Sequence, residues 1–222
     1  HLHREMGVIY GAAGLGKTSG IKYYQQKYGS QVFVIQIGQG WTPVDMFEEL
    51  LDIFGIETGG QQYTKQKALI NHVKGKPYLF VIDEAHYLSK NMIEQMRRVW
   101  DMAKVGVVFC GNDVTMTQMR GAQKVFFSHA LSRIPNRTAI KMKPSRQDVE
   151  LLLKAAQIET TKDVTKYLHA WAQGEGHFRD LYYLIKNALR EAAVQNEKLE
   201  VKHLKFAAEV YHGVSIDEVV KK

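Results

Sequence analysis

The sequence predicts an α/β fold: a parallel sheet sandwiched by helices, followed by a small all-helical lid. Two observations predict it. Short, near-continuous apolar runs alternate with segments of helical spacing as far as Pro144, and after Pro144 only helical spacing continues. Apolar strands separated by helices are typical of a parallel sheet that is covered on both faces. With 222 residues, 45% of them hydrophobic, the chain can bury one substantial core or a core with a smaller second one.

The elements of the sheet part follow from the spacing of the apolar residues. Five apolar runs predict buried strands: Met6–Tyr10, Val32–Ile37, Tyr78–Ile82, Val105–Cys110 and Thr138–Met142. Four segments between them have the period of a helix: Lys17–Tyr28, Val44–Phe54, Lys65–Val73 and Asn91–Lys104. A further helix over Phe126–Ile134 is expected ahead of the last strand. We assign residues 1–143 to this α/β domain.

The part of the chain after Pro144 predicts a separate helical domain. Its four helical segments are Ser145–Gln157, Asp163–Gln173, Phe178–Gln195 and Val201–Tyr211. Ser145 predicts an N-cap, because its hydroxyl can accept a hydrogen bond from an unpaired amide of the first turn, and Asp148 makes that turn acidic. We assign residues 144–222 to a helical lid domain.

The composition limits the classes of protein that are possible. The formal net charge is +7 and the isoelectric point is about 9.3. This charge permits binding to a polyanion through release of counterions from phosphates, although an ordinary basic soluble protein has the same balance. Cys110 is the single cysteine, so an internal disulfide is excluded, and its apolar neighbours predict a buried strand position. No apolar stretch approaches the ~20 residues of a membrane helix, and no signal peptide is recognisable, so we expect a cytoplasmic protein without membrane contact.

A phosphate-binding motif lies between the first predicted strand and the first predicted helix. Residues 11–18 read Gly-Ala-Ala-Gly-Leu-Gly-Lys-Thr and match the P-loop pattern in full. The glycines let backbone N–H groups surround the phosphates, and the helix N-terminus adds positive potential. We expect Lys17 to reach the β- and γ-phosphates of ATP and the Thr18 hydroxyl to ligate Mg²⁺. The predicted nucleotide-binding residues are Gly11, Gly14, Gly16, Lys17, Thr18 and Ser19.

Two carboxylates predict the second half of this site. Asp83 and Glu84 follow the buried strand Tyr78–Ile82, at the strand end where open α/β sheets bind ligands. We expect Asp83 to hold Mg²⁺ through water and Glu84 to orient or deprotonate the attacking water. A base beside the phosphates favours hydrolysis over transfer to a small molecule, so the predicted reaction is Mg²⁺-dependent ATP hydrolysis.

Three more polar residues are predicted to respond to the nucleotide. Asn112 follows the fourth strand, where its amide can donate to the γ-phosphate or to the attacking water. Arg133, with Arg137 as the reserve, precedes the last strand and can reach the site of a neighbouring subunit, where it would stabilise the transferring phosphoryl group. Arg179 lies in the first turn of a lid helix, and a cation at a helix N-terminus is more easily explained when an anion lies nearby.

With these motifs in place, the chain resembles the AAA+ ATPases, and among them the Mu B and TnsC family of transposition regulators. The resemblance runs from the P-loop to the lid. Its less generic part is Gly106–Asn112 followed by Leu131–Ile140, whose Ser-Arg-Ile…Arg-Thr-Ala-Ile run is similar to the Mu B pattern. The resemblance implies ATP-dependent assembly into a helical filament or ring on double-stranded DNA, with ATP at the subunit interfaces. It also implies that the assembly recruits and activates a DDE-type transposase.

The resemblance carries a DNA-binding role over to three lysines. In that family, basic residues after the P-loop and before the Mg²⁺ strand face DNA, and these positions correspond to Lys22 and to Lys65 or Lys67. Lysines on exposed helix faces of any soluble protein have the same pattern. Two alternatives therefore stay open: a protein-remodelling or secretion-associated AAA+ ATPase that binds no DNA, and a nucleotide-switched filament that recruits partners while slow hydrolysis serves as a timer.

Overall fold

The computed structural model describes residues 4–112, 136–140 and 143–215 and divides into two compact units. The first, called here the sheet unit, comprises residues 1–11 and 17–140. The second, called the helical unit, comprises residues 12–16 and 141–222. The predicted helix over residues 126–134 lies outside the described residues.

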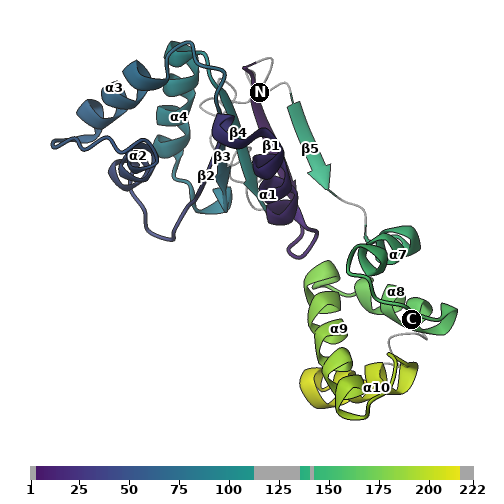
Figure 1. Cartoon of the computed structure of the whole chain (residues 1–222). Helices are drawn as coiled ribbons and strands as arrows, with labels where there is room; N and C mark the ends of the chain where they lie inside the picture. The colour runs from purple at the N-terminus through teal and green to yellow at the C-terminus, as the bar shows by residue number, and fades with distance from the viewer. Residues whose placement is uncertain (1–3, 113–135, 141–142, 216–222) are drawn as a thin grey trace. The chain divides into compact units, whose positions relative to one another are not determined.

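The sheet unit is built on five parallel strands in the order β2-β3-β4-β1-β5 (Figure 1). Their bounds are β1 Met6–Gly11, β2 Val32–Gln36, β3 Leu79–Asp83, β4 Gly106–Gly111 and β5 Asn136–Ile140. In register, β1 pairs Met6 with Val107 of β4 and Gly7 with Asn136 of β5. Because all strands run the same way, the carboxyl ends of β1, β3 and β4 meet at one edge of the sheet. That edge carries the predicted site.

The sheet is apolar on both faces because successive side chains of each strand point to opposite sides. One face, with Ile82 and Phe109 among its members, packs into the large core formed with the helices α2 (Pro43–Asp52), α3 (Gln62–Val73) and α4 (Lys90–Ala103). The other face, with Val81 and Cys110, packs against Ile21 of α1 (Lys17–Tyr28). Figure 1 shows α2, α3 and α4 grouped on one side of the sheet. Neighbouring residues of one strand thus belong to different cores, as the continuous apolar runs predict.

Two helices of the sheet unit, α2 and α4, begin at residues whose side chains satisfy free backbone amides. The bounds of the helices described in this unit are α1 Lys17–Tyr28, α2 Pro43–Asp52, α3 Gln62–Val73 and α4 Lys90–Ala103, with short 3-10 turns η1 Gly29–Gln31 and η2 Ala85–Tyr87. Thr42 and Asp45 form a reciprocal capping box ahead of α2, and Pro43 occupies its first position. The Ser89 hydroxyl accepts from the Met92 amide at 3.3 Å and caps α4.

In the part that the structure describes, the helical unit holds four helices around its own core. Their bounds are α7 Arg146–Ala155, α8 Lys162–Ala172, α9 His177–Val194 and α10 Val201–His212 (Figure 1). Val149, Leu168, Leu184 and Leu204, one from each helix, are fully buried in that core. Ser145 and Asp148 form a capping box at the start of α7, where the sequence predicts the cap.

The predicted fold class is confirmed, and the differences concern element ends. Helix α3 begins at Gln62, three residues before the predicted start at Lys65, because its first turn is polar and gives no apolar signal. Strand β5 begins at Asn136 rather than Thr138, because Asn136 and Arg137 extend the ladder with β1 although both are exposed. Within the described residues, no helix is long and apolar enough to cross a membrane.

Candidate nucleotide-binding site

The phosphate loop begins where β1 ends and α1 starts. The Lys17 ammonium donates to the Gly11 carbonyl at 2.8 Å, which holds the side chain against the start of the loop. Gly16 has φ +81°, a left-handed conformation that favours glycine, and a Cβ placed there would meet nothing within 4 Å. The first turn of α1 contains no acidic residue. The backbone amides of this turn and the Lys17 ammonium therefore provide positive potential suited to phosphate.

Residues 12–16 belong by their contacts to the helical unit. The Phe178 amide of α9 donates to the Gly14 carbonyl at 3.0 Å. Gly14 has φ +78°, and a Cβ on it would overlap the Gly176 carbonyl, so this position requires glycine. The Cβ of Arg179 lies 3.4 Å from the same point. The structure thus places Arg179 in the first turn of α9, exposed and next to the phosphate loop.

Thr18 and Asp83 meet although 65 residues separate them in the chain. The Thr18 hydroxyl donates to Asp83 Oδ2 at 2.9 Å, and the Glu84 amide donates to Asp83 Oδ1 at 2.9 Å. Asp83 is only 4% exposed. A hydroxyl and a buried carboxylate are the hard oxygen donors that Mg²⁺ prefers, and Mg²⁺ commonly takes its remaining ligands from phosphates and water. Among the described residues no group of three or more His, Cys, Asp or Glu could hold a metal ion by itself.

Glu84 is turned out of the strand by its own backbone. It has φ 53° and ψ 38°, a left-handed conformation that costs a non-glycine residue about 1 kcal/mol. This conformation ends β3 and starts the turn η2, whose Ala85 and Leu88 are buried in the large core. The Glu84 carboxylate is half-exposed, and its Oε2 lies 3.2 Å from Nδ1 of His86. His86 was not among the predicted site residues, although its place two residues after the predicted base was a usable signal.

The pKa of the Cys110 thiol depends on the charged groups near the carboxyl end of β4. Burial, followed by the negative charge of Asp83, raises the pKa of the Cys110 thiol to about 12, while the Lys17 ammonium opposes that rise. Charged groups at the start of α1 and at the end of β3 thus act on the same thiol of β4. Asn112 follows β4 directly and is half-buried, at the edge where the sequence predicts it.

The arginines predicted to act between subunits lie in or beside the part of the chain that is not described. Arg133 lies outside the described residues. Arg137, its reserve, is exposed on β5. Lys22 on α1 and Lys67 on α3, both predicted to face DNA, are also exposed.

Lys65, the third lysine predicted to face DNA, is instead buried and paired. Its side chain is 7% exposed, and its ammonium donates to the Thr58 carbonyl at 2.7 Å and pairs with Glu48 at 3.0 Å. A phosphate would have to displace both partners, so this geometry does not present Lys65 to DNA. The residue instead ties the segment before α3 to α2. The sequence prediction started α3 at Lys65, whereas the helix starts at Gln62. It therefore did not place Lys65 inside the helix, where its side chain reaches back to Thr58.

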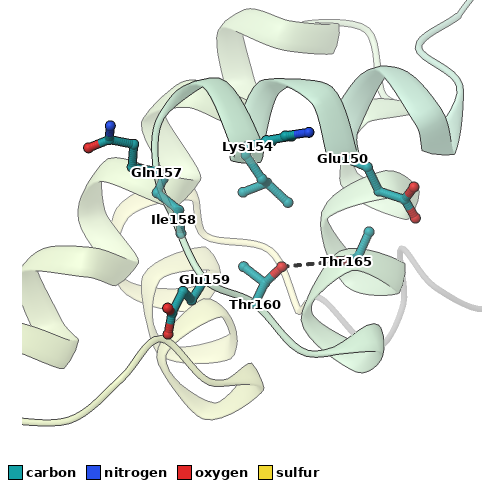
Figure 2. Close-up of a pocket in the computed structure, with 8 residues that line it drawn as sticks. Glu150, Lys154, Gln157, Ile158, Glu159, Thr160 and Thr165 are labelled. Atoms are coloured by element: carbon teal, nitrogen blue, oxygen red, sulfur yellow. Dashed lines mark hydrogen bonds between the residues drawn. The ribbon is translucent and has the colours of Figure 1, made fainter.

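A separate cavity lies in the helical unit, between the end of α7 and the start of α8 (Figure 2). The hydroxyls of Thr160 and Thr165 lie 3.3 Å apart on its wall. Glu159, also on the wall, pairs with Lys198 at 3.1 Å. None of the predicted site residues lines this cavity, and we assign no chemistry to it.

The fold and the phosphate loop define the chain as a P-loop nucleotide-binding protein. Residues 1–119 match the family model described as AAA domain, and the chain belongs to that family. Residues 132–210 match the model described as Mu B transposition protein, C terminal.

The chain is similar in sequence to two named phage proteins. It is 29% identical over 212 residues to the ATP-dependent target DNA activator B of Escherichia phage Mu, covering 93% of this chain and 66% of that protein. It is 24% identical over 180 residues to the Mu-like prophage FluMu DNA transposition protein B of Haemophilus influenzae, covering 79% and 62%. The chain therefore spans slightly less than two thirds of the length of the curated relatives it matches.

Solved structures share the fold at low sequence identity. Domain III of the replication initiation protein DnaA of Thermotoga maritima aligns with a TM-score of 0.61 at 15% identity, covering 92% of this chain and 83% of that one. A chain of the Drosophila ORC bound to DNA aligns with a TM-score of 0.66 at 13% identity, covering 96% and 56%. At these identities the likeness establishes the fold alone, which is the AAA+ arrangement of a parallel sheet followed by helices.

Proposed function

We propose that the chain binds ATP with Mg²⁺ and hydrolyses it. The observation that carries this proposal is the hydrogen bond between Thr18 of the phosphate loop and Asp83 of β3. It joins the two halves of a nucleotide site across 65 residues. Bound Mg²⁺ would neutralise charge on the phosphates, held by Thr18 and Asp83. The phosphates would lie against the loop amides and Lys17, with Gly11, Gly14, Gly16 and Ser19 completing the cradle.

Catalytic roles are assigned to four residues. Glu84 orients and deprotonates the attacking water, and Asn112 donates to the water or to the γ-phosphate. Arg179 approaches the phosphates from the first turn of α9. Arg133, or Arg137 in its place, acts in trans on the site of a neighbouring subunit. In this proposal residues 1–143 form the nucleotide-binding domain and residues 144–222 the lid.

The proposed biological role is to bind target DNA in an ATP-dependent way and deliver it to a transposase. Support comes from the similarity to the target DNA activator B of phage Mu and from the match of residues 132–210 to the Mu B C-terminal model. The partners would be double-stranded DNA, bound without sequence preference, a DDE-type transposase, and further copies of this chain in a filament or ring. The location would be the cytoplasm. Lys22 and Lys67, both exposed, are proposed to contact the phosphates of the DNA backbone.

Co-sedimentation with duplex DNA of random sequence tests this role. We expect the chain to sediment with DNA in ATP and less in ADP, and its binding to fall steeply with salt. Lys22→Glu and Lys67→Glu should weaken binding at every salt concentration. Lys74→Glu, which changes an exposed lysine at the end of the same helix α3, serves as the matched control. No sedimentation in any nucleotide, with ATP turnover intact, would instead favour a protein-remodelling ATPase.

Mixing inactive variants tests whether neighbouring subunits share a site. Arg133→Ala chains keep an intact P-loop, and Lys17→Ala chains keep an intact Arg133. If Arg133 acts in trans, the mixture should hydrolyse ATP faster than either variant alone. If the mixture hydrolysed ATP no faster than either variant alone, Arg133 would not act in trans, and Arg137 would be the remaining candidate.

A further inference from the structure

We propose that His86 is a positioning residue for the catalytic base: it fixes the orientation of the Glu84 carboxylate so that one oxygen stays available for the attacking water. The inference rests on the proposed role of Glu84. It is carried by the 3.2 Å distance between Nδ1 of His86 and Oε2 of Glu84 and by the turn that holds the two residues together.

The backbone of the turn fixes the place of His86. Glu84 leaves β3 in the left-handed conformation, and the next three residues form η2. The Tyr87 amide donates to the Glu84 carbonyl at 3.0 Å, and the Leu88 amide donates to the Ala85 carbonyl at 3.2 Å. Ala85 and Leu88 are 1% and 5% exposed. The turn is therefore anchored on its core side, and His86 has little freedom to move away from Glu84.

The imidazole also makes an aromatic contact. The ring centroids of His86 and Tyr87 lie 4.1 Å apart. The His86 side chain is 17% exposed, about half the 36% of the Glu84 side chain. The less exposed and better packed histidine is therefore the fixed member of the pair, and the more exposed glutamate is the member that it orients.

The short distance also defines which nitrogen carries a proton. A carboxylate oxygen can only accept, so an interaction with Oε2 requires a hydrogen on Nδ1, which either the Nδ1-protonated neutral ring or the cation supplies. The two atoms are close enough for an ion pair but are not aligned for a good hydrogen bond, and Nδ1 has no other partner. A small rotation of the Glu84 carboxylate would align the pair. Oε2 then faces His86, and Oε1 is left to accept a proton from water.

This arrangement predicts a defect in turnover without a defect in binding. None of the described contacts of His86 involves the phosphate loop, so losing its side chain should leave ATP affinity within about twofold. A base that samples several orientations is misplaced in most of them, and misplacement of about 1 Å can cost up to ~10²-fold in rate. We expect His86→Ala to lower kcat roughly ten- to hundredfold. His86→Asn should recover most of that loss, because the asparagine amide can donate from nearly the same point as Nδ1.

The experiment measures kcat and nucleotide affinity of the full chain with ATP, Mg²⁺ and duplex DNA. The variants are His86→Ala, His86→Asn, Glu84→Gln and the double variant of His86→Ala with Glu84→Gln. His72→Ala is the matched control, a half-buried histidine of the same unit that contacts Phe54 and Lys76. If His86 acts through Glu84, its loss should lower kcat in the wild-type background and change little in the Glu84→Gln background.

The outcomes separate this inference from the proposed role of Glu84. Wild-type turnover in Glu84→Gln would refute the role of Glu84 and the inference with it. An inactive Glu84→Gln with a fully active His86→Ala would overturn the inference alone. Three further results would also overturn it, because each would describe a merely structural histidine. They are an equal loss of kcat in His86→Ala and His86→Asn, an equal loss of kcat from His86→Ala in the wild-type and Glu84→Gln backgrounds, and a loss of ATP affinity that parallels the loss of kcat.

Discussion

The sheet unit and the helical unit use their polar side chains in different ways. In the sheet unit, polar contacts join residues far apart in the chain, such as Thr18 with Asp83 and the Trp100 indole with the Arg4 carbonyl, which are 96 residues apart. In the helical unit, the best-defined polar contacts are local. Ser145 with Asp148 and the Thr161 hydroxyl with the Val164 amide lie three residues apart and define helix starts.

This difference follows from the architecture. Parallel strands bring their carboxyl ends to one edge, so side chains from distant parts of the sequence converge there. Packed helices bury apolar faces and leave polar groups at their ends. The longer contacts of the helical unit include Lys198 with Glu159, both 85% exposed, and such pairs contribute little to stability. Chemistry is therefore expected at the sheet edge. In the helical unit, substitutions outside the phosphate loop and Arg179 should act mainly through stability.

The largest expected effect concerns the thiol at that edge. Cys110 is fully buried, and its pKa is raised from 9.0 to about 12. At neutral pH this leaves about a thousandfold less thiolate than an unperturbed thiol. Because the thiol is both less ionised and buried, we expect a thiol-alkylating reagent to modify the native chain on the order of a thousandfold more slowly than the urea-unfolded chain, with the reaction followed by mass spectrometry. Because Cys110 is the single cysteine, the label is unambiguous. Equal alkylation rates in the native and the unfolded chain would mean that the Cys110 thiol is accessible to solvent in the native chain.

The next effect tests the convergence of Thr18 and Asp83 directly. Asp83→Asn keeps the shape of the side chain but removes the charge that would hold Mg²⁺. We expect turnover to fall roughly 10²-fold or more, because the lost charge stabilisation amounts to several kcal/mol. ATPase assays over a Mg²⁺ series measure it, with Asp52→Asn on the exposed side of α2 as the control. A variant that retained turnover at ordinary Mg²⁺ would show that the contact is structural.

The sequence was sufficient for the residues whose positions follow from the period and direction of the strands. Lys17, Thr18 and Asp83 could be grouped because a P-loop and a buried strand that ends in a carboxylate must share an edge. Lys65 and His86 could not be placed in this way. The burial of Lys65 depends on how the segment around Thr58 folds back before α3. The contact of His86 depends on the left-handed conformation of Glu84, which no pattern of residue types announces.

A smaller effect is expected from the core of the helical unit. Val164 is 1% exposed, and Val164→Ala removes two methyl groups from a packed site. We expect a loss of about 2 kcal/mol in the free energy of unfolding. Trp171 lies in the same core, so its fluorescence reports this unit when Trp41 and Trp100 are replaced by Phe. ATP turnover per folded molecule should stay within about twofold. A large loss of turnover in the folded protein would show that the core of the helical unit contributes to catalysis and not only to stability.

The smallest effect concerns the cap of α7 and changes with pH. Hydrogen bonds from the Ser145 hydroxyl and amide lower the pKa of Asp148 below its ordinary value of 3.8. A carboxyl whose pKa is lowered by folding stabilises the folded state above its unfolded pKa, and this contribution is lost as pH falls through the lowered value. Ser145→Ala should therefore cost about 1 kcal/mol at pH 7, and the cost should shrink below about pH 4. Because the cap is exposed, solvent screening keeps the charged part of this cost small.

Urea unfolding at pH 7 and pH 3 measures the difference, with Ser30→Ala, an exposed serine of η1, as the control. A cost that stayed constant between the two pH values would assign it to the hydroxyl alone and not to its partnership with Asp148.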